Sequence, residues 1–148
     1  MAKLRHFAVA TADPEKTAEF YKKAFDMIEV GRTDSPIASG VYLSDGTINL
    51  AVLKYKSVEA AGPERGLEWY GLHHFGFWVD DVDAAGKKIE EAGGTYMMGE
   101  ATHSPGTYYE VKYRGPDGVI CDITANGWAG AEKDVAKADA KPEPVAAE

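Results

Sequence analysis

The sequence of 148 residues has one cysteine, no excess of basic residues and no long apolar run. Cys121 alone cannot form an internal disulfide, which is typical of proteins in a reducing cytoplasm. A net charge of -8 argues against nucleic acid or an anionic membrane as a partner, because both require a basic surface. No segment approaches the roughly 20 apolar residues of a membrane span, and the N-terminus lacks a signal-peptide pattern. These absences indicate a cytoplasmic protein without a nucleic-acid or membrane partner.

One stretch of the sequence occurs twice, at residues 4–13 and again at residues 72–81. Both copies read Leu-x-His-Phe, then small and apolar residues, then an acidic residue. The alternation of residues predicts a strand in each copy, with His6 or His74 in its middle. A helix is predicted after each strand, over 14–26, where Asp13 is the cap, and over 82–92, where Asp80 or Asp81 is the cap. Such repetition indicates one structural unit written twice.

Three more strands are predicted in each half of the chain, over 28–32, 41–44 and 47–54, and over 95–99, 107–113 and 119–124. The pattern therefore predicts an α+β fold of two tandem βαβββ modules, residues 1–54 and 72–128. Residues 55–71 are predicted to be a linker, because glycine and proline interrupt any regular pattern there. From Ala129 onward alanine, charges and two prolines replace the aromatic residues, so residues 129–148 are predicted to be a mobile tail.

Each module also offers an oxygen-bearing side chain in its last strand. Asp122 and Asn49 are both flanked by apolar residues, which would pack against the helix of their module. Alternation then places Asp122 and Asn49 on the opposite face, together with His74 and His6. Two neutral imidazoles and a carboxylate suit a divalent ion such as zinc, nickel, cobalt, manganese or iron(II), with positions left open for water or substrate.

The strand before Asp122 supplies a second group of candidates. Alternation directs Tyr108, Glu110, Lys112 and Arg114 toward the histidine face or its rim. Glu110 could act as a general base if it reaches the substrate. The alternative is a solvated charge ladder between Glu110 and Lys112.

Further side chains carry weaker signals. Alternation places His73 on the helix side, where a structural role is expected, and it places Trp78 on the histidine face as a candidate substrate wall. His103 lies in a loop that could fold over the site or remain solvated. An anionic substrate group could be held by one of four cations: Arg5, Arg32, Lys112 or Arg114.

These features resemble the vicinal oxygen chelate superfamily, the group of glyoxalase, bleomycin-resistance and extradiol-dioxygenase-like proteins. The resemblance covers residues 3–125 and lies in the paired x-His-Phe strands, the helix start at residues 13–21 and the hairpin at residues 115–124. It implies a cup-shaped mixed sheet with the helices on its outer face. It also implies a divalent metal at the mouth of the cup, held by ligands carried over by position: His6, Asn49, His74 and Asp122.

The resemblance further implies a glyoxalase I-like lyase or isomerase that acts on a substrate with vicinal oxygens, with glutathione as a candidate co-substrate. Asp122 or Glu110 would move the proton, because Asn49 cannot take one up and stands where such enzymes commonly carry glutamate. Two alternatives stay open. A neutral Asn49 favours an extradiol-type ring-cleaving dioxygenase, whereas a drug-binding protein of the bleomycin-resistance type needs no metal ligands. Members of the superfamily often pair, so a homodimer is expected.

Overall fold

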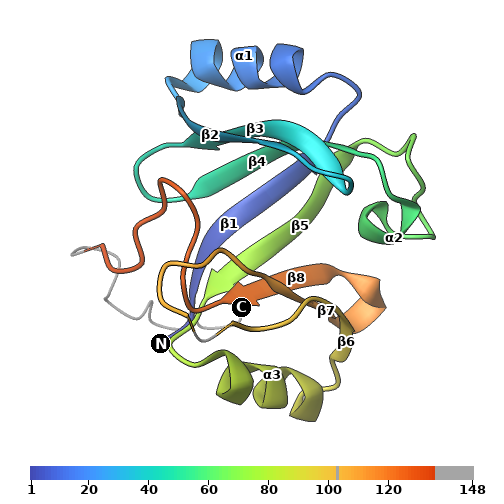
Figure 1. Ribbon diagram of the computed structural model, residues 1–148, viewed down its shortest axis with the longest axis vertical. Helices are drawn as coiled ribbons and strands as arrows, with labels where there is room; N and C mark the ends of the chain where they lie inside the picture. The colour runs from blue at the N-terminus through green and yellow to red at the C-terminus, as the bar shows by residue number, and fades with distance from the viewer. Residues whose placement is uncertain (103, 136–148) are drawn as a thin grey trace, which may run out of the picture.

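The computed structural model describes residues 1–102 and 104–135, which form one open, curled sheet of eight strands (Figure 1). The strand order is β2-β3-β4-β1-β5-β8-β7-β6. The strands are β1 Lys3–Ala10, β2 Ile28–Asp34, β3 Ala38–Ser44, β4 Asn49–Tyr55, β5 Gly71–Trp78, β6 Thr95–Met98, β7 Val111–Arg114 and β8 Ile120–Thr124. The helices are α1 Pro14–Phe25, α2 Val58–Ala61 and α3 Val82–Glu91, and a 3-10 turn, η1, spans Pro116–Gly118. The predicted α+β fold is confirmed.

The sheet has the internal symmetry that the repeated sequence predicts. β1 runs parallel to β4, and β5 runs parallel to β8 in the same way. The two units join through their first strands, because β1 and β5 pair in antiparallel fashion at the centre of the sheet. The strands that carry the repeated histidines are therefore neighbours, although the two histidines are far apart in the sequence.

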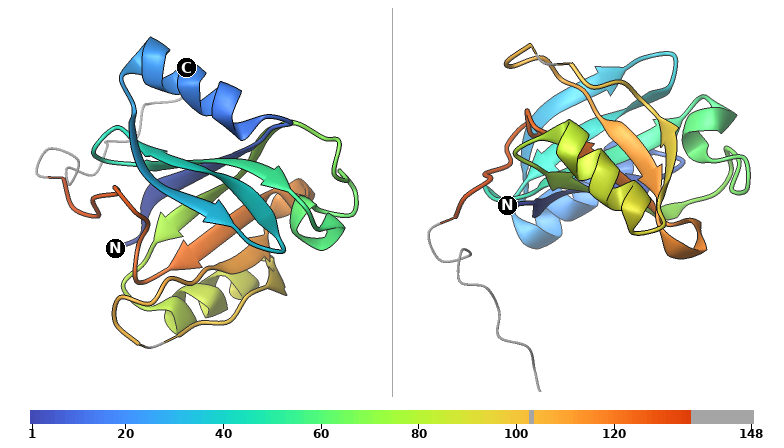
Figure 2. Two further views of the ribbon diagram at one scale, coloured as in Figure 1. Left: turned by 45° about the horizontal axis from the view of Figure 1, so that its top comes forward. Right: turned by 90° about the horizontal axis from the view of Figure 1, so that it is seen from below.

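The long helices begin where the sequence supplies a capping carboxylate. Asp13 accepts a hydrogen bond from the backbone N–H of Lys16 at the start of α1, and Asp81 does the same for Ala84 at the start of α3. Figures 1 and 2 show α1 and α3 at opposite ends of the molecule, with the sheet between them. Each helix packs on an apolar core formed by the outer face of its own unit. The opposite, concave face is left for the site.

Three segments differ from the sequence-based expectation. The linker contains the short helix α2, in which Ala60 and Ala61 are buried. β7 begins at Val111, so residues 107–110 approach the site as irregular backbone. Residues 129–133, predicted as the start of a mobile tail, hydrogen-bond to strands and loops of both units. His103 and residues 136–148 lie outside the described residues. No helix in the described part of the chain is long and apolar enough to cross a membrane.

Candidate metal centre

The pairing of the two central strands brings three of the predicted ligands together. His6 Nε2 lies 3.2 Å from His74 Nε2, and His74 Nε2 lies 3.2 Å from Asp122 Oδ2. The two imidazoles and the carboxylate are buried, with at most 4% of each side chain exposed. Their candidate ligand atoms all lie within 4.8 Å of one another. Among the residues that the structure describes, this is the one such group of three histidine, cysteine or acidic side chains.

The tautomer of His6 follows from its hydrogen bond to Asn49. The Asn49 amide nitrogen donates to the carbonyl of Ala129, 2.8 Å away, so its oxygen faces His6 Nδ1, also 2.8 Å away. An oxygen can only accept, so Nδ1 carries the proton of the neutral ring and Nε2 presents a lone pair. Burial lowers the pKa of His6 to about 4, which keeps the ring neutral at pH 7. Asn49 therefore uses both ends of its amide within the protein.

The tautomer of His74 follows in the same way from its hydrogen bond to His73. His73 Nε2 lies 2.8 Å from the carbonyl of Ala61 and must donate to it. His73 Nδ1 is then an acceptor, with the Tyr55 hydroxyl 3.2 Å away and His74 Nδ1 2.8 Å away. Two bare nitrogens would repel each other at 2.8 Å, so His74 Nδ1 carries a proton and donates it to His73. Burial lowers the pKa of His73 to about 4 and that of His74 to about 3, so both rings are neutral at pH 7. His74 consequently presents Nε2 as a second bare lone pair.

His73 does not occupy the helix side that alternation predicts. Ala8 of β1 pairs with His74, but the next residue, Val9, pairs with Leu72, so β5 carries one extra residue at this point. Such a bulge places two residues of one strand opposite one residue of the other and breaks the alternation of faces. The side chain of His73 consequently lies beside His74.

The arrangement of acceptors fits a bound cation. Two imidazole lone pairs face each other at 3.2 Å with no proton between them. Asp122 Oδ1 is buried and has no hydrogen-bond partner among the described residues. Buried acceptors without donors are costly, and a divalent ion would satisfy all three groups at once. Two nitrogens and one carboxylate oxygen form a donor set for a borderline metal such as zinc, nickel, cobalt, manganese or iron(II).

The register of the sheet shows that Asn49 and Asp122 do not occupy equivalent positions in the two units. Asn49 lies opposite His6 in the parallel pair β1–β4, whereas Asp122 lies opposite Gly76 in β5–β8. The repeat relates Gly76 to Ala8, and the partner of Ala8 is Ala51. The counterpart of Asp122 in the first unit is therefore an alanine. The sequence-based pairing of Asn49 with Asp122 differs from this register by two residues.

Two more charged groups complete the site. Lys112 Nζ donates to Asp122 Oδ2 and to Glu110 Oε2, the latter at 3.0 Å. Glu110 Oε1 accepts a hydrogen bond of 2.6 Å from Trp128 Nε1 and lies 3.8 Å from His6 Nε2. Burial opposes ionisation of Glu110, but Lys112, the two histidines and the Trp128 N–H together outweigh it and hold the pKa of Glu110 well below its usual range. Burial raises the pKa of Asp122 to about 7, against the opposing charge of Lys112.

These groups line a hollow of about 450 Å³ in the concave face of the sheet. His6, His74, Glu110 and Lys112 lie on its polar side. The remaining wall is largely apolar and aromatic, with Ile37, Ala38, Tyr42, Ala51, Leu53, Tyr55, Ala60, Met98 and Tyr108. The volume is within the usual range of small-molecule sites. Glu110 is the carboxylate that lines the hollow, whereas Asp122 does not line it and is fully buried.

Other candidates from the sequence lie elsewhere. Trp78 donates to the carbonyl of Ala125 and does not line the hollow. Of the four cations considered for an anionic substrate, Lys112 alone lines it. Arg5 donates to the carbonyls of residues 132 and 133, and the other two arginines pair with glutamates outside the hollow.

Trp128 is a site residue that the sequence reasoning missed. Its ring stacks on His6, with centroids 4.8 Å apart and planes 5° from parallel, and its N–H holds Glu110. Gly76 makes room for it, because a Cβ at that position would lie 2.7 Å from the indole. The available signal was an aromatic residue soon after the last strand, where the chain otherwise loses its apolar residues.

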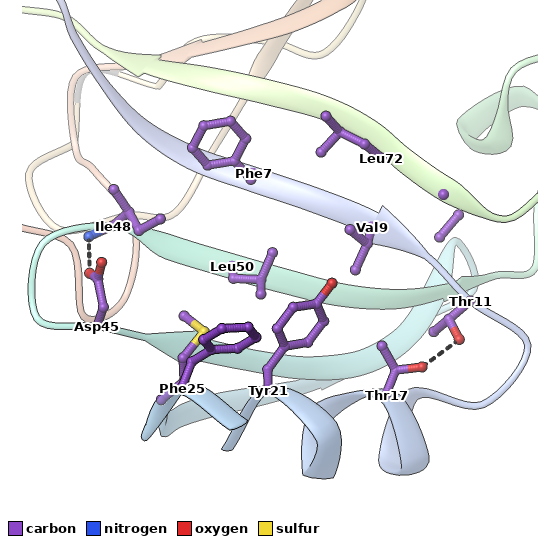
Figure 3. Close-up of a pocket in the computed structure, with 13 residues that line it drawn as sticks. Phe7, Val9, Thr11, Thr17, Tyr21, Phe25, Asp45, Ile48, Leu50 and Leu72 are labelled. Carbon is purple, nitrogen blue, oxygen red and sulfur yellow. Dashed lines mark hydrogen bonds between the residues drawn. The ribbon is translucent and has the colours of Figure 1, made fainter. Parts of the chain in front are cut away.

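A second, larger hollow of about 850 Å³ lies between α1 and the outer face of the sheet (Figure 3). Its walls are mainly apolar, with Phe7, Val9 and Leu50 from the strands and Tyr21 and Phe25 from the helix. None of the three clustered candidate ligands lines it. His6 and His74 line the concave hollow instead.

Comparison with known proteins supports the same fold. The family model described as the Glyoxalase/Bleomycin resistance protein/Dioxygenase superfamily matches residues 3–123. A search of the curated proteins finds no match.

Solved structures match the chain over most of its length. Methylmalonyl-CoA epimerase from Streptomyces coelicolor is 20% identical, with a TM-score of 0.67, and the match covers 82% of this chain and 94% of the epimerase. The epimerase from Mycobacterium tuberculosis is 18% identical, with a TM-score of 0.63 and coverages of 81% and 85%. A hypothetical protein from Bacillus halodurans is 18% identical, with a TM-score of 0.66 and coverages of 82% and 92%. At this level of identity the likeness extends to the fold alone.

Proposed function

Because the chain belongs to the glyoxalase/bleomycin resistance protein/dioxygenase superfamily, we propose that it is a metal-dependent enzyme of the isomerase or lyase type. Its substrate would be a small molecule with oxygens on adjacent carbons. The observation that carries the proposal is the convergence of three buried acceptor groups, His6, His74 and Asp122, beside a hollow that contains an ionised glutamate. Structural relatives named as epimerases support an isomerase-type reaction.

In this proposal His6, His74 and Asp122 hold the metal. The bound ion would act as a Lewis acid toward the substrate oxygens. Asn49 orients His6 instead of binding the ion, since its oxygen accepts from His6 Nδ1 and its nitrogen donates to the Ala129 carbonyl. Neighbours that hold a ligand imidazole in one tautomer are a common feature of metal sites.

Glu110 is the proposed base. Its carboxylate is ionised, faces the hollow and is fixed by donors on two sides, Trp128 on one oxygen and Lys112 on the other. It would take a proton from the substrate carbon next to a carbonyl and return it to the neighbouring carbon. Asp122 is less suited to this step, because it is fully buried and bonded to Lys112.

The first test is metal content. Wild type and His74→Ala would be stripped with a chelator, reloaded separately with zinc, nickel, cobalt, manganese or iron(II), and analysed for bound metal. The proposal expects one ion per chain in the wild type and its loss in the variant. A wild type that binds none of the five ions would overturn the enzyme proposal and leave the drug-binding alternative.

The second test is proton exchange. The metal-loaded protein would be incubated in deuterium oxide with a panel of 2-hydroxy and 2-oxo carbonyl compounds, each with and without glutathione. Glu110→Gln should retain the metal and lose deuterium incorporation by about 10²–10⁴-fold. Glu64→Gln is the matched control, because Glu64 is an exposed carboxylate paired with Arg114. Equal exchange by Glu110→Gln and wild type would remove Glu110 from the mechanism.

One observation favours a second function. Two histidines and one carboxylate form the ligand set of non-haem iron(II) oxygenases. In this chain Ala51 occupies the register position where a fourth, oxygen ligand would stand. Oxygen uptake by the iron(II)-loaded protein in the presence of catechols would favour the ring-cleaving alternative. Uptake no faster than with the metal-free protein would leave the isomerase proposal.

The proposed site does not require a second chain, since both units of one chain supply its residues. A homodimer is still proposed, because both edges of the open sheet, β2 and β6, lack a neighbouring strand within the described chain. The molecular mass measured in solution by light scattering would decide this question.

A further inference from the structure

The residue before each candidate ligand histidine stands outside the regular register of its strand. In β5 the bulge leaves His73 without a pairing partner, and the corresponding shift in β1 leaves Arg5 without one. The side chains of both residues donate hydrogen bonds to backbone carbonyls outside the sheet, in the segment after the second unit and in the linker between the units. Arg5 donates to the carbonyls of residues 132 and 133, and His73 donates to the carbonyl of Ala61 in α2.

The linker between the two units holds His73 from two directions. Its side chain donates to Ala61, and its own carbonyl accepts a hydrogen bond of 2.7 Å from Arg65. The guanidinium of Arg65 also lies 4.5 Å from the ring centroid of Trp69, which fixes its position. His73 is 4% exposed, so water does not compete for these bonds. The Tyr55 ring packs on His73 with centroids 4.5 Å apart, and its hydroxyl lies 3.2 Å from His73 Nδ1. The orientation of the His73 ring is thus set by residues 55–69.

This orientation determines which nitrogen of His74 is bare. Because the proton of His73 lies on Nε2 and is donated to Ala61, His73 Nδ1 can only accept. His74 Nδ1 lies 2.8 Å from it and must carry a proton, which leaves His74 Nε2 free beside His6 and Asp122. A reversed His73 tautomer would place the lone pair of His74 on the wrong side of the ring.

We propose that His73 is a positioning residue for the metal centre, through which the linker holds His74 in the metal-binding tautomer. This inference rests on the proposed metal site. It gives residues 55–71 a role beyond joining the units, since the same segment supplies Ala60 to the wall of the hollow and the Ala61 carbonyl to His73. The first unit reaches the same result differently, with the amide of Asn49 in place of a neighbouring imidazole.

Two substitutions separate this role from a purely structural one. In His73→Asn the amide oxygen can occupy the place of Nδ1 and accept from His74, but the bond to Ala61 is lost. In His73→Gln the longer amide can reach Ala61 as Nε2 does, but no acceptor remains for His74. A structural role predicts that Gln preserves the protein better than Asn. The proposed role predicts the opposite order for metal affinity.

The experiment measures zinc affinity by competition with a chromophoric chelator, together with chemical denaturation of the metal-free proteins. We expect His73→Gln to bind zinc about 10- to 100-fold more weakly than wild type. His73→Asn should remain within about threefold of wild type, because a retained acceptor removes the cost of an unpaired donor. Equal zinc affinity of the Gln variant and wild type would overturn the proposal, as would an Asn variant as weak as Gln.

A second readout does not depend on the metal. In metal-free wild type labelled with nitrogen-15 on histidine, the chemical shifts of His74 should show a protonated Nδ1 and an unprotonated Nε2. In His73→Gln this pattern should be lost or mixed. Absence of the pattern in wild type would refute the inference about His73 even if zinc binds. The presence of the pattern in a protein that binds none of the five ions would instead refute the proposed function and leave the hydrogen bonds of His73 intact.

Discussion

Removal of the Lys112 ammonium is the sharpest perturbation of the buried charges. Lys112 lies 3.0 Å from a Glu110 oxygen and also bonds Asp122, while 19% of its own side chain is exposed. At an effective dielectric constant of about 20, one such pair is worth about 5 kcal/mol. Burial of the ammonium offsets part of this attraction, and loss of one partner of a buried pair typically costs about 3–5 kcal/mol. Lys112→Met should therefore lower the free energy of unfolding of the metal-free protein by about that amount.

The loss should also depend on pH and on metal. Without Lys112, Glu110 and Asp122 are adjacent buried carboxyls with raised pKa values, whereas the histidines are the same in both proteins. The loss of stability relative to wild type should therefore grow as pH rises from 5 to 8. A divalent ion supplies positive charge in the same place. At a metal concentration of about 1,000 times the wild-type Kd, the wild type should gain about 4 kcal/mol of stability. The variant should gain more, because the ion there also replaces the missing positive charge, so metal should restore most of the difference between variant and wild type.

The assay is urea denaturation in the presence of a chelator and again with zinc. Lys56→Met is the matched control, because Lys56 pairs with Asp34 at the surface, where 80% of the Asp34 side chain is exposed. That variant should lose no more than about 1 kcal/mol. If Lys112→Met costs no more than Lys56→Met, the ammonium does not stabilise buried carboxylates, and the charge assignment of the site is wrong.

Three further predictions concern the surroundings of the site. Gly76→Ala should lower the free energy of thermal unfolding by about 1–3 kcal/mol, because the added Cβ would press on the Trp128 ring. Gly115→Ala is the control and should be close to neutral, since its Cβ meets its first neighbouring atom at 3.8 Å. Equal effects of the two substitutions would contradict the packing argument. Trp128→Phe keeps an aromatic ring on His6 but removes the hydrogen-bond donor to Glu110. Deuterium exchange should therefore fall about tenfold or more, while zinc affinity is unchanged. A loss of zinc affinity without a loss of exchange would show that Trp128 supports the metal ligand His6 and not Glu110. Finally, burial lowers the pKa of the three site histidines to between about 3 and about 4 and raises that of Asp122 to about 7. Between pH 6.5 and 4 the three histidines are thus protonated in the unfolded chain and neutral in the folded protein, whereas Asp122 is protonated only in the folded protein. The unfolded chain therefore binds more protons than the folded protein. The free energy of unfolding of the metal-free protein should fall by up to about 3 kcal/mol for each unit that the pH is lowered. Denaturation midpoints that do not change between pH 6 and 5 would contradict these protonation states.

Much of the fold could be predicted because its signals are local. A carboxylate before a run of helix-forming residues identified both long helices, as the caps at Asp13 and Asp81 show. The repetition of Leu-x-His-Phe identified the two units. It also predicted that their first strands are equivalent, and β1 and β5 indeed pair at the centre of the sheet.

The surroundings of the ligands could not be predicted, because register and bulges depend on pairing between distant strands. Simple alternation sent His73 to the wrong face, since the bulge in β5 is visible only against β1. Pattern matching equated Asn49 with Asp122, whereas the register makes Ala51 the counterpart of Asp122. Trp128 lay outside every repeat and reaches His6 only after the chain has folded back.

The sequence by itself determined the class of the fold, the duplicated unit and the residue types available for a metal: two repeated histidines and a carboxylate in a terminal strand. These follow from periodicity and composition, which act over a few residues. The tertiary structure alone decided which nitrogens are bare, which carboxylate faces the hollow and which neighbours hold them. Those properties depend on hydrogen bonds to Ala61, Ala129 and Lys112, and such contacts exist only once the two units have joined.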